Sequence, residues 1–409
     1  MTFKTLSREE FDKFVHIYNT KSIYQTIEYA SIMEKQDFKC VFFGLVEEDI
    51  IQAATMIMIK KINGYNYAFA PRGFLIDYNN LKMLEKFTAG VKKQLSKMGV
   101  VAVRLSPLLI RSITDPKRNI TKTNPLYDSS KENLKKCGFN HMGYNDFFEA
   151  SKPRFEAILD LNEQYPVLFS RIKKEFRNKI RNSEKMGIRI YKGNQNDLKY
   201  LYFQIKKSYA RDLSFFQSCY YFYKQRNMID FYYAKIDTRI YLEKAQQDYM
   251  KQEKISTEIE SEIINPNLVN TQKMITRKIE NDKRLNLCSN RIVQATNLLR
   301  DKPEGVVIAS ILVVKHQNTV DLLLDGYDPN FKNINGKHLL IWKLIEKYSK
   351  LGYRYFNLGG ITNIQKENKR YAGLNEFKLN FGSNIVEYVG DLELVTNQAL
   401  YFMYKKRKK

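Results

Sequence analysis

The residue whose setting most directly suggests chemistry is Lys378. It lies between Phe377 and Leu379 in an apolar, glycine-flanked segment that we expect to form a strand or a turn. Burying an ammonium group is costly without a partner, so this lysine is a candidate for stabilising negative charge that develops on an acyl carbonyl or a phosphate. The alternative is a lysine whose side chain follows an apolar surface out to solvent.

A second group of cations lies on a predicted helix that ends at Gly187. Arg177, Arg181 and Lys185 are spaced four residues apart, so they form one basic stripe suited to the phosphates of a nucleic-acid backbone. The alternative is a solvated amphipathic helix whose cations favour its own C-terminal dipole.

Arg211 is a third candidate, because it stands beside Asp212 within an aromatic cluster. A guanidinium in this setting binds a phosphate bidentately or pairs with a carboxylate. The 409-residue chain has 68 Lys and Arg against 44 Asp and Glu, which gives a formal charge of +24. This surplus favours nucleic acid, lipid headgroups or a phosphorylated substrate as partner, although a lysine-rich solvated surface also accounts for it.

Two similar modules are predicted to position these residues. From Cys40, clustered β-formers around turn signals predict an antiparallel meander, followed by a helix and a strand that begins at Val100. From Gly305 the same order returns, with strands on either side of Gln317-Asn318 and then a helix and a strand. The repeated order favours an internal duplication with helices packed on a sheet in each half, although convergence also produces such an order.

Residues 239–303 are polar and charged and contain no glycine. Apolar stripes on either side of the turn signal Asn265-Pro266-Asn267 predict an antiparallel helical hairpin inserted in the second module. About 25 to 30 residues per helix give an arm of roughly 40 Å, too long to lie within the core of one domain. The simplest alternative is an interaction or dimerisation hairpin.

Several kinds of site are excluded by motif. The four cysteines and four histidines are isolated, without C-x-x-C or H-E-x-x-H spacing, so no metal site is expected. Serine-hydrolase, dinucleotide and P-loop motifs are missing as well, and no cofactor is predicted. The first residues lack a signal-peptide core, and the longest apolar run, Val306–Val314, is too short to span a bilayer. We therefore expect a cytoplasmic protein with peripheral membrane contact.

The repeated module resembles the GNAT acetyltransferase type. Acyl-CoA members of that type cradle the pyrophosphate on a Q/R-x-x-G-x-G/A turn. The matching position here reads NINGKH, with one glycine, so a CoA donor is disfavoured and we expect the acyl group on another carrier.

Taken in order, the motifs along almost the whole chain resemble the Fem family of tRNA-dependent peptidoglycan-bridge aminoacyltransferases. No single motif is decisive, and their joint order is specific. They are Q-T-I-E-Y-A at Gln25, A-P-R-G-F-L-I-D-Y at Ala70, R-N-K-I-R-N-S-E-K-M-G at Arg177, A-R-D at Ala210 and G-L-N-E-F-K-L-N-F-G at Gly373.

The resemblance implies an α+β fold of two GNAT-like subdomains with an inserted antiparallel helical coiled-coil arm, similar to the tRNA-contacting arms of synthetases. We expect the first subdomain at residues 1–150, the second at 151–238 and 304–390, and the arm at 239–303. Residues 391–409 are expected to form a C-terminal helix and basic tail packed on the first subdomain.

The activity implied by the resemblance is attack by an amino group of the peptide stem, or of a bridge residue, on the ester carbonyl of aminoacyl-tRNA. Lys378, in the family's F-K motif with Phe377, would stabilise the oxyanion or the leaving ribose and phosphate. Lys35 and Arg211 would hold the diphosphate of the acceptor, which is lipid II or a UDP-linked muropeptide. The other expected substrate-binding residues are Arg72, Gly359, Gly360 and Tyr371; the expected tRNA-phosphate contacts are Arg177, Arg181 and Lys185.

The implied partners also include the inner leaflet of the cell membrane and homologous bridge-forming enzymes. Two departures from the family pattern bear on the chemistry. Lys35 stands two positions later than the lysine of the family's A-E-V-K segment, and Ser106-Pro107 replaces a D-P pair, which removes one carboxylate base. We therefore expect substrate- or tRNA-assisted deprotonation of the attacking amine. A CoA-dependent N-acetyltransferase and a non-catalytic tRNA- or partner-binding protein remain the alternatives.

Overall fold

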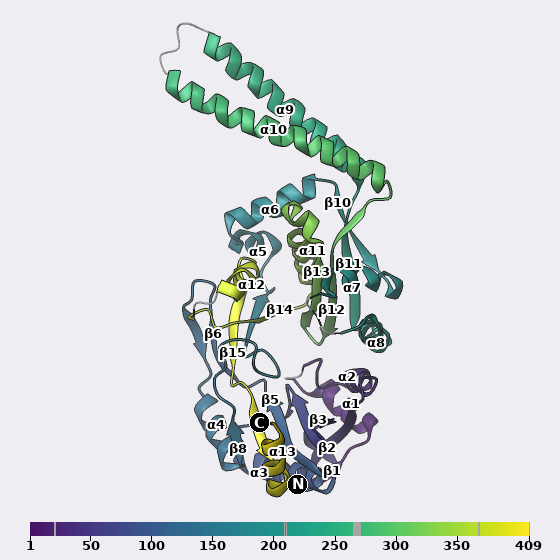
Figure 1. Ribbon diagram of the computed structural model, residues 1–409. Helices are drawn as coiled ribbons and strands as arrows, with labels where there is room; N and C mark the ends of the chain where they lie inside the picture. Colours follow the sequence, from purple (N-terminus) through teal and green to yellow (C-terminus); the bar gives the residue numbers. More distant parts are fainter. Residues whose placement is uncertain (20–21, 208, 210, 265–270, 367–368, 409) are drawn as a thin grey trace.

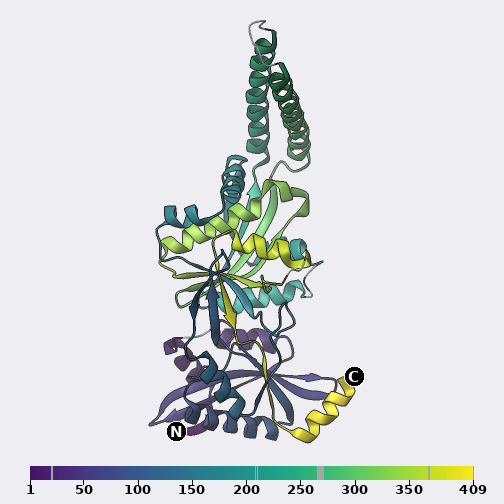
Figure 2. The ribbon, with the colours of Figure 1, turned by 90° about the vertical axis from the view of Figure 1, so that its left-hand side faces the viewer.

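The computed structural model describes residues 1–19, 22–207, 209, 211–264, 271–366 and 369–408. Two mixed sheets, each covered by helices, follow one another along the length of the molecule (Figure 1). A helical arm projects beyond the second sheet, and both termini lie at the opposite end (Figure 2). The fold is α+β, as predicted.

The first sheet is a meander extended by a crossover. It consists, in spatial order, of β1 (Thr2–Thr5), β2 (Lys39–Glu47), β3 (Ile50–Ile62), β4 (Tyr65–Pro71), β5 (Val100–Ser106), β16 (Leu392–Val395) and β8 (Phe139–His141). Strands β1 to β4 are antiparallel to their neighbours, whereas β4 and β5 are parallel. Parallel strands need a crossover, which α3 (Leu81–Lys97) supplies. The expected strand at Val100 and the helix before it are confirmed.

The second sheet repeats this arrangement and adds strands to it. Its spatial order is β10 (Ile188–Gly193), β11 (Ile229–Ile236), β12 (Val306–His316), β13 (Thr319–Tyr327), β14 (Tyr355–Ile361), β9 (Phe155–Asp160), β15 (Asn384–Tyr388), β6 (Ile110–Thr114) and β7 (Ile120–Thr123). The parallel pair here is β13 and β14, and it is joined only from Thr319 to Asp321 and from Tyr355 to Asn357. Beyond these residues the two strands separate.

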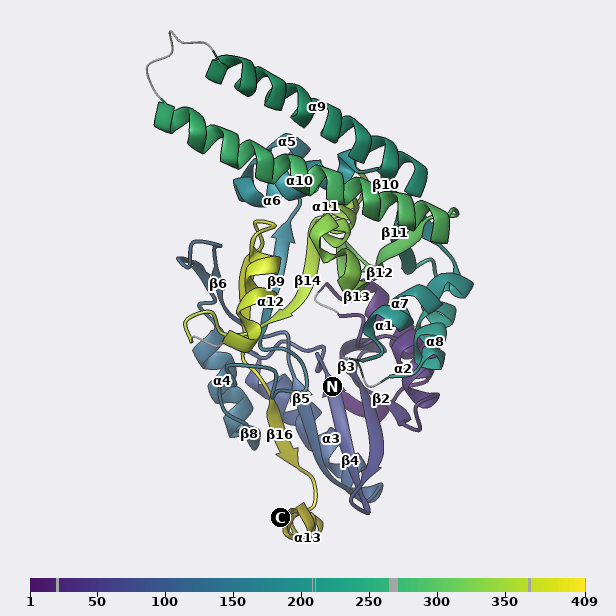
Figure 3. The ribbon, with the colours of Figure 1, turned by 45° about the horizontal axis from the view of Figure 1, so that its top comes forward.

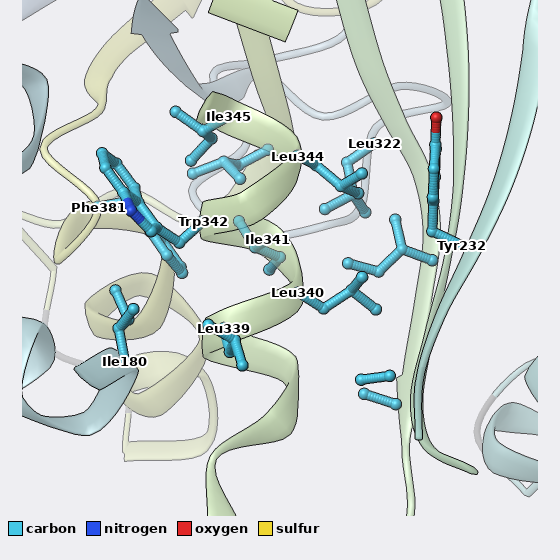
Figure 4. Packing of buried hydrophobic residues seen from close by; sticks show 14 of the residues in the cluster. Ile180, Tyr232, Leu322, Leu339, Leu340, Ile341, Trp342, Leu344, Ile345 and Phe381 are labelled. Carbon is cyan, nitrogen blue, oxygen red and sulfur yellow. The ribbon is translucent and has the colours of Figure 1, made fainter. Parts of the chain in front are cut away.

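Helix α11 (Gly336–Lys350) forms the crossover between β13 and β14 and carries much of the second core. Leu340 and Leu344 point toward the strand that carries Tyr232, whereas Trp342 points the other way, toward Phe381 (Figure 4). Because the helix buries residues on both sides, it is fixed between the sheet and the helices outside it. The second core therefore holds the ends of β13 and β14 in place.

The two sheets exchange strands. β6 and β7 lie between β5 and β8 in sequence but belong to the second sheet. Conversely, β16 follows β15 of the second sheet and lies between β5 and β8 in the first. The chain therefore crosses from one sheet to the other before β6, after β7, before β9 and after β15.

The remaining helices cover the sheets. Helix α13 packs on the first sheet, where its buried Tyr404 lies against Tyr67, Val101 and Ala102. The helices are α1 (Arg8–Ile17), α2 (Ile27–Glu34), α4 (Tyr127–Lys136), α5 (Tyr165–Arg171), α6 (Lys174–Lys185), α7 (Leu198–Ile205), α8 (Leu213–Lys224), α12 (Lys369–Leu379) and α13 (Gln398–Lys408), with 3-10 turns at Gln195–Asp197 and Pro329–Ile334.

The arm consists of α9 (Thr238–Ile264) and α10 (Thr271–Asp301), which lie side by side and antiparallel (Figure 3). Ion pairs link them along their length, for example Arg291 with Asp248 at 3.1 Å. The helical hairpin is confirmed, while the turn expected at residues 265–267 lies outside the described residues. No helix in the described part of the chain has both the length and the apolar character needed to cross a bilayer.

Candidate functional site

A cavity of 570 Å³ lies where β13 and β14 separate, at the junction of the two subdomains. The first subdomain contributes the loop before α2 and the residue that follows β4. The second contributes both separated strands, β9, β15 and α12. Its polar lining includes Arg72, Glu156, Asp321, Asp325, Asn357 and Lys378.

Lys378 lies on α12, not in a strand or turn as expected. Phe377 of this helix packs against Phe176 of α6 and His338 of α11, and Phe381, just beyond the end of the helix, packs on Phe377 and lies in the second core. This leaves Lys378 on the cavity side, where its Nζ donates a hydrogen bond of 2.8 Å to the carbonyl oxygen of Gly360. Burial lowers the pKa of Lys378 to about 8, against a raising effect of the Asp325 carboxylate.

Gly359 and Gly360 of β14 allow neighbouring groups to approach this strand closely, Lys378 at Gly359 and Pro153 at Gly360. Gly359 has a φ of 82°, and a Cβ there would lie 3.4 Å from Nζ of Lys378. A Cβ on Gly360 would lie 2.5 Å from the ring of Pro153. Because glycine adopts positive φ without strain and occupies no side-chain space, both residues shape the cavity wall as well as line it. They were expected to bind substrate, and the structure places them beside Lys378.

Arg72 and Glu156 form a buried ion pair that joins the two subdomains. Arg72 follows β4, Glu156 lies on β9, and their nearest atoms are 2.5 Å apart. The guanidinium also donates to the carbonyl oxygen of Pro153 at 2.9 Å and stacks on the ring of Tyr388. Arg72, expected to bind substrate, lines the cavity, but these contacts with protein groups make it a residue that positions the cavity wall.

Asn357 connects this pair to the strands that separate. Its Nδ2 donates to Glu156 at 3.1 Å and to Asp321 at 2.8 Å, and its Oδ1 accepts from the backbone N–H of Gly359. Asp321 in turn pairs with His316 at 2.7 Å. Gly359 and Gly360, close by in the sequence, were expected site residues, but the sequence gave no sign of Glu156, Asp321 or His316, which are brought together from different strands.

Arg211 lies outside the cavity lining, on the surface beside α2. Its Nη1 donates to Oε1 of Gln36 at 2.9 Å, and Nε2 of Gln36 donates to the carbonyl oxygen of Lys35. Both residues expected to hold a diphosphate, Lys35 and Arg211, are exposed, and Gln36, which follows Lys35 in the chain, binds the Arg211 guanidinium. No ion pair joins Arg211 to Asp212 in the described residues; the Asp212 carboxylate accepts from Ser214 and from the backbone N–H of Phe215, which caps α8.

Lys152 is a cation that sequence reasoning missed. Its Nζ lies 3.2 Å from the ring centroid of Tyr24, a residue of the cavity wall, and no ion pair joins it to a carboxylate of the described chain. Burial, together with the positive charges of Arg72 and Arg211 and against the raising effect of Glu156, lowers its pKa to about 7. Lys152 thus lies between the cavity and Arg211, in a segment whose sequence carries no motif.

Two other expected site residues lie away from the cavity lining. The ring of Phe377 packs against Phe176, His338 and Phe381 and faces a second cavity of 380 Å³. Tyr371 packs with Phe147 and Phe148. Phe377, expected to act with Lys378, therefore supports the helix that carries the lysine, because neighbouring positions on a helix face different ways.

The basic stripe on α6 lies near the base of the arm. Gly187 follows this helix, and its carbonyl oxygen accepts from the backbone N–H of Asp237, just before α9. Arg177 donates to the carbonyl oxygen of Ser170 at 2.7 Å, and Arg181 lies over the ring of Phe169. The third cation, Lys185, is exposed. The stripe is thus brought next to the arm but not to the cavity.

The motifs disfavour two kinds of site, a metal centre and a CoA-type phosphate turn. The described residues contain no group of His, Cys, Asp and Glu that could hold a metal ion. The segment NINGKH runs from the end of the 3-10 turn into α11, where Gly336 packs against Ile308 and Lys337 pairs with Asp325. The cation of this turn is therefore already engaged by a carboxylate of the main cavity.

Comparison with known proteins agrees with this architecture. Lipid II:glycine glycyltransferases of Staphylococcus epidermidis and Staphylococcus aureus are 21% and 20% identical to the chain, and each match covers 98% of this chain and 95% of the relative. The crystal structure of FemX matches with a TM-score of 0.74 at 18% identity, covering 98% of this chain and 99% of that one. A tandem GNAT protein from the clavulanic acid biosynthesis pathway matches with a TM-score of 0.51 at 7% identity, covering 97% and 98%.

These structural matches confirm the prediction of two GNAT-like subdomains. The model of the FemAB family matches residues 6–409, which is nearly the whole sequence. The resemblance seen in the order of the motifs is thereby confirmed, and the chain belongs to the FemAB family.

Proposed function

We propose that this protein is an aminoacyltransferase that moves an amino acid from aminoacyl-tRNA to an amino group of the peptide stem of lipid II, building the interpeptide bridge. The observation that carries the proposal is Lys378, an ammonium in the wall of a cavity between the subdomains. Relatives named lipid II:glycine glycyltransferase support the acceptor and the reaction class. A cation preorganised in a cavity suits a reaction that passes through an oxyanion.

In the proposed reaction the acceptor amine attacks the ester carbonyl carbon and forms a tetrahedral oxyanion. The carbon–oxygen bond to the ribose then breaks, an amide remains, and a proton lost by the amine ends on the ribose oxygen. Lys378 stabilises the oxyanion or the leaving ribose oxygen, because its Nζ is held in place by Gly360 and has further protons to donate.

The carboxylates of the cavity are already engaged. Glu156 accepts from Arg72 and Asn357, Asp321 accepts from Asn357 and pairs with His316, and Asp325 pairs with Lys337. The charge of Lys337 holds the pKa of Asp325 below its usual value despite burial, which makes this carboxylate a weak base. Because these carboxylates are engaged by protein groups, their contacts support deprotonation of the attacking amine with the help of the substrate or the tRNA.

The turnover number should fall on the alkaline side as Lys378 loses its proton. Because the pKa of Lys378 is about 8 and the Asp325 carboxylate raises it, Asp325→Asn should shift this fall to lower pH while activity persists at neutral pH. Lys378→Arg should abolish the fall up to pH about 10, because guanidinium stays protonated. The measurement is kcat against pH for the three proteins. If the pH profile of Asp325→Asn were unshifted, or if this variant were inactive at every pH, the role of the Lys378 ammonium in turnover would be contradicted.

The acceptor diphosphate is proposed to bind at Lys35 and Arg211, with Lys152 as a third cation. A charged hydrogen bond contributes about 1.5–3 kcal/mol, so Arg211→Ala should raise KM for lipid II about tenfold and change kcat little. Lys152→Met should have the same direction of effect, and Lys199→Ala, an exposed lysine on α7, is the matched control. Steady-state kinetics at varied lipid II concentration make the measurement, and an effect on kcat alone would remove these residues from the diphosphate site.

The aminoacyl-tRNA donor is proposed to lie along the end of the second subdomain that carries the arm, away from the acceptor site at Lys35 and Arg211. Arg181 and Lys185 are exposed on α6, whose C-terminal end meets the base of the arm. Cations on α6 next to the projecting arm suit contacts with RNA phosphates. Such contacts contribute affinity but no sequence specificity. The ester end of the tRNA would then reach Lys378 from the α12 side.

One experiment tests the reaction as a whole. Purified protein is given labelled aminoacyl-tRNA and lipid II, and transfer of label to the muropeptide is scored with free amino acid and acetyl-CoA as alternative donors. Transfer from aminoacyl-tRNA alone is the expected result. Transfer from acetyl-CoA would instead support the N-acetyltransferase, and tRNA binding without transfer would support a binding protein.

A further inference from the structure

Helix α13 presents an outward face that the rest of the described chain leaves uncovered. Its inner side packs on the first sheet through Tyr404, which is 5% exposed. On the other side, Phe402 is 61% exposed and Met403 is 44% exposed. Single exposed apolar residues are ordinary on protein surfaces, but two adjacent large ones on one helix call for an explanation.

Cations surround this apolar pair. Lys405 and Lys406 follow on the same helix and are exposed, and Nζ of Lys406 lies over the ring of Phe402. Arg407 lies over the ring of Tyr65 at the start of β4. We call the surface formed by Phe402, Met403, Lys405, Lys406 and Arg407 the α13 face.

The chemistry of the α13 face fits an anionic bilayer surface. Phe and Met side chains insert among acyl chains at the level of the headgroups, and each surrounding cation gains about 1 kcal/mol near anionic lipid. A nucleic acid would also attract the cations. However, the aliphatic Met403 beside Phe402 offers a wedge for hydrocarbon rather than a platform for stacked bases.

The position of the α13 face relative to the proposed acceptor site supports the same partner. Tyr404 of α13 packs on Tyr65, and the hairpin that contains Tyr65 also contains Lys60. Lys60 donates to the carbonyl oxygen of Gln36 at 3.0 Å, and Gln36 holds Arg211. A continuous series of contacts thus connects the helix to the cations proposed for the diphosphate.

The arm lies at the other end of the molecule. Figures 1 and 2 show α13 at the end of the first subdomain, with α9 and α10 beyond the second. A bilayer that touched the α13 face would therefore leave the arm free on the side away from the lipid. This separation suits a protein whose two proposed partners are both polyanions, because each meets a different end.

We propose that α13 docks the protein on anionic membranes by inserting Phe402 and Met403 between lipid headgroups while Lys405 and Lys406 bind their phosphates. The inference deepens the proposed transfer to lipid II, a lipid-linked acceptor, and rests on it for its biological purpose. Its test uses no tRNA and no lipid II, so the failure of docking and the failure of aminoacyl transfer are separate results.

The first measurement is sedimentation of the full chain with vesicles of phosphatidylcholine alone or mixed with phosphatidylglycerol. We expect binding only to the anionic vesicles, weakened by salt. Phe402→Ser with Met403→Ser, and separately Lys405→Gln with Lys406→Gln, should each weaken binding about tenfold or more. The matched controls are Ile17→Ser, which removes another exposed apolar side chain, and Lys92→Gln with Lys93→Gln on α3; neither should change binding.

A second measurement reports insertion itself. Trp342, the one tryptophan of the chain, is buried, so Phe402→Trp adds a single exposed reporter to a constant background. Its emission should shift to shorter wavelength with anionic vesicles and stay unchanged with an RNA duplex. No binding of the unaltered chain to anionic vesicles, equal binding by the Phe402 and Met403 variant, or a response to RNA alone would overturn the proposal. Unchanged thermal unfolding of each variant excludes misfolding as the cause of lost binding.

Discussion

Replacing Lys378 with alanine should lower kcat by about two to three orders of magnitude and leave KM for lipid II within about threefold. The reason is the geometry at the cavity wall. Nζ of Lys378 is fixed by the carbonyl oxygen of Gly360 and has no carboxylate partner within the described chain, so its remaining protons are free to meet charge that develops during the reaction. An interaction made mainly with the transition state affects turnover rather than binding.

Three further variants make this result specific. Lys378→Met keeps the length and apolar stem of the side chain, and it should be as inactive as alanine. Lys378→Arg should keep part of the activity because the cation is retained, although the larger group must fit beside Gly359. Lys350→Ala removes an exposed lysine on α11 and should change nothing. Full turnover in Lys378→Ala would remove the lysine from the chemistry.

Glu156→Ala should lower the free energy of unfolding by about 3–5 kcal/mol, the largest effect on stability that we expect from one substitution. The change leaves the guanidinium of Arg72, which is 2% exposed, without its carboxylate partner. It also removes the acceptor of one hydrogen bond from Asn357, so the strands at the cavity lose a second constraint. Urea unfolding followed by circular dichroism measures the difference.

The control for Glu156 is an exposed pair of the same residue types. Glu163 pairs with Arg171 at the surface, and Glu163→Ala should cost less than about 1 kcal/mol. Replacing both buried partners, as in Arg72→Met with Glu156→Leu, should recover part of the stability, because neither charge is then left alone. If Glu156→Ala matched Glu163→Ala, the buried pair would not be what joins the two subdomains.

The periodic parts of the fold could be predicted from the sequence. Strands β12 and β13 flank Gln317 and Asn318 as expected, and the apolar stripes of the two arm helices correctly predicted the helical hairpin. These features depend on neighbours within a few residues, which a pattern records directly. The position of Lys378 on a helix was missed because its apolar and glycine neighbours also suit a strand, and the packing of Phe377 against Phe176 and His338 of distant helices is not visible in local sequence.

The polar network of the cavity could not be predicted in the same way. Glu156, Asp321 and Asn357 come from three strands, and none stands in a motif that announces its partner. Lys152 likewise becomes notable only because folding buries it beside Tyr24. The exchange of β6 and β7 for β16 was also missed, since pairing between distant strands depends on the whole chain rather than on local periodicity.

The place of β16 bears on how the first sheet is completed. Residues Leu392–Val395 fill the gap between β5 and β8, yet they follow every other described strand of both sheets in the chain. Until β16 is in place, the first sheet presents two unpaired strand edges, which are sites where chains associate wrongly. The sheet that begins first in the sequence is thus completed by the last of the described strands.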